Sequence, residues 1–562
     1  MSQPNPSTAL ARVVVDEMRR HGVAFVVLSP GSRSGALAIA AAESELSTRV
    51  VIDERSAAFW ALGRAKATGL PATVISTSGT AAANFLPAVV EADMSLTPLL
   101  VVSADRPAEM RGIGANQTID QTDLFGDKVR LSTTIEATGC DFDGNESWRT
   151  TVSSALRAAR GELGRPGPVH LNIAFREPTV PVSDDGRSRS SPYRYSIQGR
   201  AADQPWVEPR SVDIPVPTIE IPPCRRGLVI AGDGLYDRDA LMVAAASVGW
   251  PVVASALSGL RGREVISHGH LALAGGVLDQ LRPEVVLAVG SVGPSQRLEQ
   301  LIGAAEVRIR VDAGGRTIDP GRNATEVVHG DPVLLLESVG EEVGDGDWNE
   351  AWSSVDSEVK EAVDGYLADV PHPTGPGIAS ALNRCEWVTL VVASSLPVRD
   401  IEAHLARSGS VIGNRGASGI DGFISTSLGV ASSGPGVLAL SGDLSLLHDM
   451  NGFLAESLDD LIVIVIDNNG GGLFDLLPQA SHAPHFERLF ITPPDRRVED
   501  VARLHDLNHV EVSRLGDLPD LVGTAQGAGV SLLRVPVDRS DDLHVRAALD
   551  EIGAEAARLV LS

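Results

Sequence analysis

Cysteine and long hydrophobic runs are both scarce in this sequence of 562 residues. The three cysteines, Cys140, Cys224 and Cys385, are far apart and odd in number, which fits neither a disulfide framework nor a zinc site. No apolar run approaches the roughly 20 residues that span a bilayer, and the amino-terminal segment lacks the charged and apolar regions of a secretory signal. We therefore expect a soluble, cytoplasmic protein.

Positive charge is also in short supply. Acidic residues outnumber basic ones 73 to 47, for a formal net charge of −26. Such a surface repels nucleic acid and anionic membranes, so neither is an expected partner. Neither a Ser-His-Asp set nor an HExxH motif is recognisable, which argues against hydrolytic and zinc chemistry. An anionic substrate would therefore need arginines in its binding site to offset the negative potential of the whole protein.

Glycine is abundant, and its distribution indicates an α/β protein. The chain has 56 glycines and 43% hydrophobic residues, and short apolar strands alternate with amphipathic helices. Its length predicts two to four domains, and we expect three doubly wound parallel-sheet domains. The predicted divisions are residues 1–185, a polar linker at 186–225, a central domain at 226–345, a helix and connector at 346–375, and a last domain at 376–562.

The two outer domains share one internal pattern. In each, a strand ends in Ser-Gly, a helix follows, and the next strand begins about 20 residues later; the glycines are Gly79 and Gly442. Any two βαβ units share a similar rhythm, so the pattern suits a duplication without proving one.

The carboxyl ends of two strands in the last domain predict a metal and diphosphate site. Asp443 follows one strand, and Asn468 and Gly470 follow the next, about 25 residues later. Parallel strands place their carboxyl ends at one edge of a sheet, where such folds bind ligands. A carboxylate, an amide oxygen and a backbone carbonyl make half of an octahedral Mg²⁺ shell, and the helix after Gly442 favours an anion.

This segment resembles the thiamine diphosphate motif, which runs Gly-Asp-Gly and then, after about 25 residues, Asn-Asn. Two positions depart from that pattern: Leu444 replaces the last glycine, and Asp467 stands at the first asparagine. The resemblance therefore implies Asp443, Asn468 and Gly470 as ligands of Mg²⁺ or Mn²⁺, with Asn469 as the alternative to Asn468. It also implies a pyrimidine-binding first domain and a diphosphate-binding last domain.

A glutamate against the aminopyrimidine ring is the other requirement of this family, and Glu54 is the candidate. It lies between a predicted strand and an apolar helix, where a glutamate alone would usually be a surface residue. In the family, this carboxyl group promotes the imino tautomer of the cofactor, so we expect Glu54 to be catalytic.

The resemblance narrows to the 2-succinyl-5-enolpyruvyl-6-hydroxy-3-cyclohexene-1-carboxylate synthases of menaquinone biosynthesis. It is carried by SPGSRS (29–34), IDERSA (52–57), TSGTAAANF (77–85), SADRP (103–107), GANQT (114–118), SSLPVRD (394–400), NRGASGIDG (414–422) and NNGGGLFDLLP (468–478). It implies decarboxylation of 2-oxoglutarate and 1,4-addition of the succinyl carbanion to isochorismate. It further implies a homodimer, often paired into a tetramer, whose cofactor bridges two subunits.

Both implied substrates are dianions, which guanidinium groups bind well. The expected substrate residues are Ser32, Arg33, Arg106, Asn116, Gln117, Ser395, Arg399 and Arg415. Further expected cofactor contacts are Ile420, which props the bent cofactor, and Gly442, Leu444, Ser445, Phe474 and Leu477. The family often has a lysine where this chain has Gln296, which leaves that segment without an expected substrate role.

Three alternatives stay open at this point. One is another thiamine diphosphate enzyme of the acetolactate synthase kind, although four arginines fit a small monoanion poorly. Another is a non-catalytic relative that keeps a diphosphate pocket. A Rossmann dehydrogenase is disfavoured because the turn at Gly232-Asp233-Gly234 lacks the GxGxxG spacing.

Overall fold

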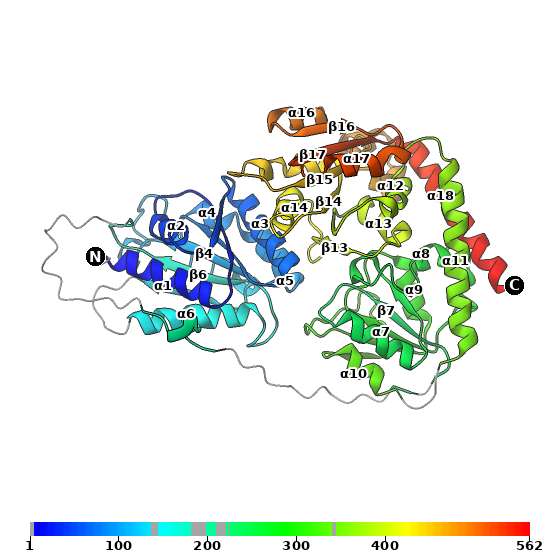
Figure 1. The fold of residues 1–562 in the computed structure, drawn as a ribbon, viewed down its shortest axis with the longest axis horizontal. Helices are drawn as coiled ribbons and strands as arrows, with labels where there is room; N and C mark the ends of the chain where they lie inside the picture. The colour runs from blue at the N-terminus through cyan, green and yellow to red at the C-terminus, as the bar shows by residue number, and fades with distance from the viewer. Residues whose placement is uncertain (1–4, 137–143, 181–197, 209–220, 223, 340–343) are drawn as a thin grey trace, which may run out of the picture. The chain divides into compact units, whose positions relative to one another are not determined.

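The computed structural model describes residues 5–136, 144–180, 198–208, 221–222, 224–339 and 344–562 (Figure 1). The chain forms two compact units. Unit 1 comprises Met1–Val212, Asn414–Pro435 and Leu447–Asp459, and unit 2 comprises Asp213–Gly413, Gly436–Leu446 and Asp460–Ser562. Much of the predicted linker at 186–225 lies outside the described residues.

Unit 1 contains a six-stranded parallel sheet in the order β2-β1-β3-β4-β6-β5. Its strands are β1 (Phe25–Leu28), β2 (Ser47–Val50), β3 (Ala72–Ser76), β4 (Leu99–Asp105), β5 (Ser132–Glu136) and β6 (Val169–Ala174). Its helices are α1 (Pro6–Arg20), α2 (Gly35–Ala42), α3 (Glu54–Thr68), α4 (Thr80–Ala83), α5 (Leu86–Met94), α6 (Gly144–Ala159) and α14 (Phe423–Ala431).

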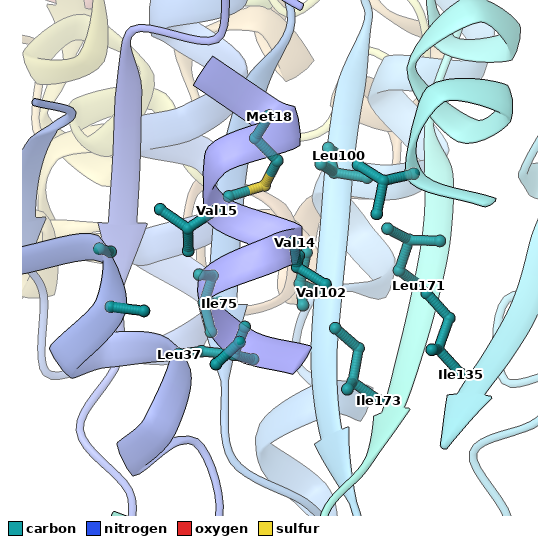
Figure 2. Packing of buried hydrophobic residues seen from close by; sticks show 14 of the residues in the cluster. Val14, Val15, Met18, Leu37, Ile75, Leu100, Val102, Ile135, Leu171 and Ile173 are labelled. Carbon is teal, nitrogen blue, oxygen red and sulfur yellow. The ribbon is translucent and has the colours of Figure 1, made fainter. Parts of the chain in front are cut away.

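Apolar periodicity explains how α1 packs on this sheet. Val14 and Met18 lie one helical turn apart and face the β-branched and leucine side chains of β4 and β6, as Figure 2 shows. The central strands β3 and β4 are buried along their whole length, because helices cover both faces of a parallel sheet.

Unit 2 contains two further parallel sheets. The five-stranded sheet has the order β11-β10-β9-β7-β8 and the six-stranded sheet β13-β12-β14-β15-β17-β16. The strands are β7 (Gly227–Ala231), β8 (Val252–Ala254), β9 (Val285–Val289), β10 (Val307–Val311), β11 (Glu326–Val328), β12 (Thr389–Val392), β13 (Ser410–Gly413), β14 (Val437–Gly442), β15 (Leu461–Asp467), β16 (Asn508–Glu511) and β17 (Val530–Pro536).

Helices flank both of these sheets. Their bounds are α7 (Arg238–Ser247), α8 (Gly269–Ala272), α9 (Gln296–Ala304), α10 (Pro332–Glu337), α11 (Gly346–Asp369), α12 (Gly375–Ala381), α13 (Leu396–His404), α15 (Asp443–His448), α16 (Val498–Leu504), α17 (Leu518–Ala525) and α18 (Arg539–Leu561). The long helices α11 and α18 pack along each other and share one apolar cluster with β7 and β9.

The prediction of three parallel sheets in an α/β fold is confirmed. The first and last sheets moreover have the same strand order, counted from their own first strands. Ser78-Gly79 follows the third strand of the first sheet and Ser441-Gly442 ends the third strand of the last sheet, which supports a duplicated design. The exact domain boundaries stay predictions.

Candidate active site

The carboxyl ends of β14 and β15 meet as the sequence predicted. Gly442 pairs in register with Ile466, so the loops that follow both strands leave the same edge of the sheet. Asp443 is buried there, and its two carboxylate oxygens accept hydrogen bonds from the backbone N–H groups of Leu444 and Gly470, each at 2.7 Å. The geometry thus ties Asp443 directly to the Asn-Asn-Gly loop.

The environment of Asp443 suits a cation. Burial raises the pKa of Asp443 to about 6, and the negative charge of Asp467 acts in the same direction. A bound Mg²⁺ would offset both effects, and each carboxylate oxygen keeps a second lone pair. Within the described part of the chain, no three His, Cys, Asp or Glu residues cluster to hold a metal alone. A buried carboxylate beside a loop with amide and backbone oxygens is a donor set that Mg²⁺ shared with a diphosphate would fit.

The two asparagines of this loop face different surroundings. Asn468 is half-buried, and its side-chain nitrogen would lie 2.5 Å from a Cβ placed on Gly472. Asn469 is exposed, has a left-handed backbone with φ 59°, and lines a separate cavity of about 560 Å³ beside Arg534. This arrangement favours Asn468 over Asn469 as the ligand.

The first strand of the same sheet contributes Ser395 and Arg399. β12 lies between β13 and β14. Because the chain goes from β12 to β13 on one side and then to β14 on the other, the carboxyl ends of β12 and β14 form the topological switch point of the sheet. Ser395 has a backbone φ of 77°, a conformation that residues other than glycine adopt only under strain. Its carbonyl accepts a 2.6 Å hydrogen bond from Arg399, whose pKa burial lowers.

The remaining predicted contacts of unit 2 follow Asp443 or the glycine loop. Leu444 and Ser445 lie in the first turn of α15 and are half-buried. Phe474 packs against Phe490 with ring centroids 5.5 Å apart, and Leu477 is half-buried.

A corresponding switch point lies in unit 1, between β1 and β3. Ser32 and Arg33 follow β1, Ser78 follows β3, and Arg106 follows β4. Arg106 is buried and donates from Nη1 to the Ser78 hydroxyl at 2.5 Å and to the Gln117 carbonyl at 2.6 Å. Arg33 hydrogen-bonds the carbonyl of Phe175 at 3.1 Å.

These two arginines influence each other. Burial lowers the pKa of Arg106, and the positive charge of Arg33 lowers it further. Gln117 is exposed, has φ 52°, and donates its amide to the Ser78 carbonyl at 3.0 Å; Asn116 is exposed beside it. The structure thus gathers Arg33, Arg106 and Gln117 in one cluster, in which Arg33 also forms an ion pair with the exposed Glu177 at 3.2 Å.

Glu54 begins helix α3. The preceding Asp53 caps that helix by accepting hydrogen bonds from the N–H groups of Arg55 and Ser56. The other oxygen of Asp53 accepts from the Asn451 amide at 2.9 Å, which fixes the turn from a second side. Glu54 itself is half-buried.

The loop at 414–422 carries Arg415 and Ile420 and is also held in unit 1. Buried Glu91 of α5 accepts the N–H groups of Gly416 at 3.0 Å and Ala417 at 2.7 Å. Arg415 is half-buried, and Ile420 is 42% exposed. An exposed isoleucine in a fixed loop is consistent with a contact to a bound cofactor.

Comparisons with known proteins identify the family of this chain. Residues 8–124 match the family model described as thiamine pyrophosphate enzyme, N-terminal TPP binding domain. A 2-succinyl-5-enolpyruvyl-6-hydroxy-3-cyclohexene-1-carboxylate synthase of Thermobifida fusca is 39% identical, over 99% of this chain and 100% of its own. Synthases of the same name from Saccharopolyspora erythraea and Listeria innocua are 38% and 33% identical, over 96% and 97% of this chain and 97% of each relative. This chain belongs to that synthase family.

Two buried side chains that accept hydrogen bonds, Gln121 and Glu91, are not indicated by the sequence. Gln121 accepts a hydrogen bond from the N–H of Gly79 at 2.9 Å and donates one to Asn172 at 2.9 Å. It therefore links the Ser78-Gly79 turn to β6. Glu91 anchors the loop of Arg415. Gln121 stands only four residues after Gln117, but nothing in its local sequence indicates burial.

Other features of the chain have structural explanations. Gln296 begins helix α9, and the neighbouring Arg297 forms an ion pair with Asp550 at 2.7 Å. That arginine holds α9 against α18, so no substrate role is needed to explain it. No helix among the described residues is long and apolar enough to cross a membrane.

Proposed function

We propose that this protein decarboxylates 2-oxoglutarate and adds the succinyl fragment to isochorismate in a thiamine diphosphate-dependent reaction of menaquinone biosynthesis. The product would be 2-succinyl-5-enolpyruvyl-6-hydroxy-3-cyclohexene-1-carboxylate. The observation that carries the proposal is similarity to synthases of that name over nearly the whole chain, at up to 39% identity. The contact between Asp443 and Gly470 is consistent with it.

We assign the diphosphate and metal site to the end of β14 and the loop after β15. Asp443, Asn468 and the Gly470 carbonyl would hold Mg²⁺ or Mn²⁺, and Gly442, Leu444 and Ser445 would contact the diphosphate. Ile420, Phe474 and Leu477 would contact the rings of the cofactor. When bound, thiamine diphosphate supplies the nucleophilic and electron-accepting chemistry of the reaction.

Glu54 is the proposed catalytic residue of the protein. It would hold a proton on a ring nitrogen of the aminopyrimidine, which requires a carboxyl group in a fixed position. The cap formed by Asp53 and its hydrogen bond to Asn451 hold the backbone from which Glu54 extends, which supports this assignment.

The arginines would orient the two dianionic substrates. Arg106 donates to two neutral oxygens, and burial and the charge of Arg33 lower its pKa, so a bound dianion would stabilise its positive charge. We assign this pair to isochorismate, together with Ser32, Asn116 and Gln117. We assign Arg399 and Arg415, with Ser395, to the carboxylates of 2-oxoglutarate.

We further propose that the active form is a homodimer or homotetramer in which Glu54 serves a cofactor bound by another subunit. The metal dependence belongs to the same proposal. The cytoplasmic location expected from the sequence stays a prediction.

Product analysis by mass spectrometry tests the reaction. Purified protein with thiamine diphosphate, Mg²⁺, 2-oxoglutarate and isochorismate should yield the succinylated cyclohexene carboxylate, and omission of any one component should abolish it. Replacement of 2-oxoglutarate by pyruvate is the matched control. Carboligation with pyruvate, and none with 2-oxoglutarate, would instead indicate an enzyme of the acetolactate synthase kind.

A further inference from the structure

A cavity of about 890 Å³ lies in unit 2. Its walls come from the carboxyl-terminal half of α11, from α12 and the turn after it, from the segment that follows α13, and from Arg514 and its neighbours. None of the residues assigned above to the cofactor or the substrates lines this cavity. It is therefore a separate feature of the fold.

The charges around the cavity oppose the charge of the protein. Lys360, Arg384, Arg407 and Arg514 line it, and Asp364 is the one carboxylate among its lining residues. The chain as a whole carries a net charge of −26. A concentration of basic side chains around a concave surface raises the local concentration of anions.

Two of the four basic side chains, Arg384 and Arg514, are available to a ligand. Arg384 and Arg514 are exposed, and neither side chain has a hydrogen bond or an ion pair to any residue within the described ranges. Nη1 of Arg407 is buried and has no hydrogen-bond partner among those residues, whereas Nη2 donates to the Trp387 carbonyl at 3.1 Å and lies 3.6 Å from the exposed carboxylate of Glu386. The lone carboxylate, Asp364, is already paired with Lys360 at 2.8 Å.

The position of Arg407 is well fixed. Its guanidinium lies over the Trp387 ring at 4.7 Å from the centroid, and its backbone N–H donates to the Asn383 side chain at 3.0 Å. A guanidinium held in place in this way loses little conformational entropy when it binds an anion. This is the property expected of a binding residue rather than of a solvated surface arginine.

Apolar side chains complete the wall. Leu367, Val370 and Leu515 line the cavity between the basic groups. A free inorganic anion would leave this surface exposed to water, whereas an organic ligand would cover it. The lining thus favours an apolar body that carries anionic groups.

We propose that this cavity is a second ligand site, which binds a small organic dianion with carboxylate or phosphate groups on an apolar body. Arg384, Arg407 and Arg514 bind the anionic groups, and Leu367, Val370 and Leu515 contact the body. The proposal is independent of the reaction proposed above, because the two sets of residues do not overlap.

Isothermal titration calorimetry of the enzyme loaded with cofactor and Mg²⁺ tests this site, with phthalate and phenyl phosphate as probes. At least one probe should bind at low ionic strength, and its affinity should fall as salt is added. The double variant Arg384→Gln/Arg514→Gln should weaken binding about tenfold, the effect of two partly screened charge interactions. Arg165→Gln, an exposed arginine of unit 1, serves as the matched control and should leave the affinity unchanged.

Each outcome decides the matter. Tighter binding of phenyl phosphate identifies a phosphate ligand, and tighter binding of phthalate identifies a carboxylate ligand. Equal affinities of the double variant and the control would place the anion elsewhere, for instance at the arginines of the active site, and would overturn the proposal. Absence of binding by both probes at millimolar concentration would also overturn it. Turnover of the double variant with its natural substrates shows separately whether the proposed reaction stands.

Discussion

Substitution Glu91→Gln probes how the loop of Arg415 is held in place. The carboxylate of Glu91 accepts the N–H groups of Gly416 and Ala417, and its Oε1 also lies 2.7 Å from Nζ of Lys66. Both partners of this ion pair are almost fully buried, with side chains 9% and 3% exposed. Glutamine keeps one acceptor oxygen, but it removes the charge and turns an N–H₂ donor toward other donors.

The expected loss of stability follows from these contacts. Removal of one partner of a buried, hydrogen-bonded ion pair costs about 3 kcal/mol in the free energy of unfolding. The same change lets residues 414–422 move, so the KM for 2-oxoglutarate should rise through Arg415 while the KM for isochorismate changes less. Urea unfolding and steady-state kinetics measure the two effects.

Two further variants complete the test. Glu45→Gln is the matched control, because the Glu45 side chain is 84% exposed and its ion pair with Arg19 should contribute less than about 0.5 kcal/mol. Adding Lys66→Met to Glu91→Gln should restore part of the lost stability, because the buried positive charge is then removed as well. A Glu91→Gln variant as stable as Glu45→Gln, with an unchanged KM for 2-oxoglutarate, would refute the reasoning.

Three other predictions concern packing, backbone strain and pH. Gly63→Ala should destabilise the protein by about 2 kcal/mol in urea unfolding, because its Cβ would lie 2.1 Å from the Thr426 carbonyl of α14; Gly365→Ala, with open space around it, should instead stabilise α11 by about 0.5 kcal/mol. Ser395→Gly should relieve the strain at φ 77° and raise stability by about 1 kcal/mol in thermal unfolding, yet raise the KM for 2-oxoglutarate; lower stability would contradict the strain. Burial lowers the pKa of His170 from 6.5 to about 4. Between these values His170 is neutral in the folded state but protonated in the unfolded state, so protons favour unfolding. Stability should therefore fall as the pH drops from about 7 to 5, by about 2 kcal/mol more in the wild type than in His170→Gln, and equal slopes would show that His170 is not the group responsible.

Much of the architecture could be predicted from local patterns. Strands β1 and β15 are uninterrupted apolar runs, each followed by a glycine-containing turn, and such runs suit buried parallel strands. The meeting of Asp443 with the loop at Gly470 followed from the rule that parallel strands end at one edge of a sheet.

The supporting residues could not be predicted in the same way. Glu91 stands in LPAVVEADM, where a glutamate resembles any solvated helix residue, and its burial comes from a segment more than 300 positions away in sequence. Gln121 depends likewise on Asn172 of β6. The resemblance already named Asn468 as the ligand, and the exposure and left-handed backbone of Asn469 add a reason that a run of polar and glycine residues does not specify.

The most direct test of the proposed chemistry compares wild type with Glu54→Gln in the consumption of isochorismate, with 2-oxoglutarate, thiamine diphosphate and Mg²⁺ present. Glutamine matches the size of the carboxyl group but cannot exchange a proton in the same way, so turnover should fall at least about 100-fold. The rise in melting temperature caused by cofactor and Mg²⁺ should persist in the variant, because Asp443, Asn468 and Gly470 are intact. Undiminished isochorismate consumption by Glu54→Gln would contradict the account.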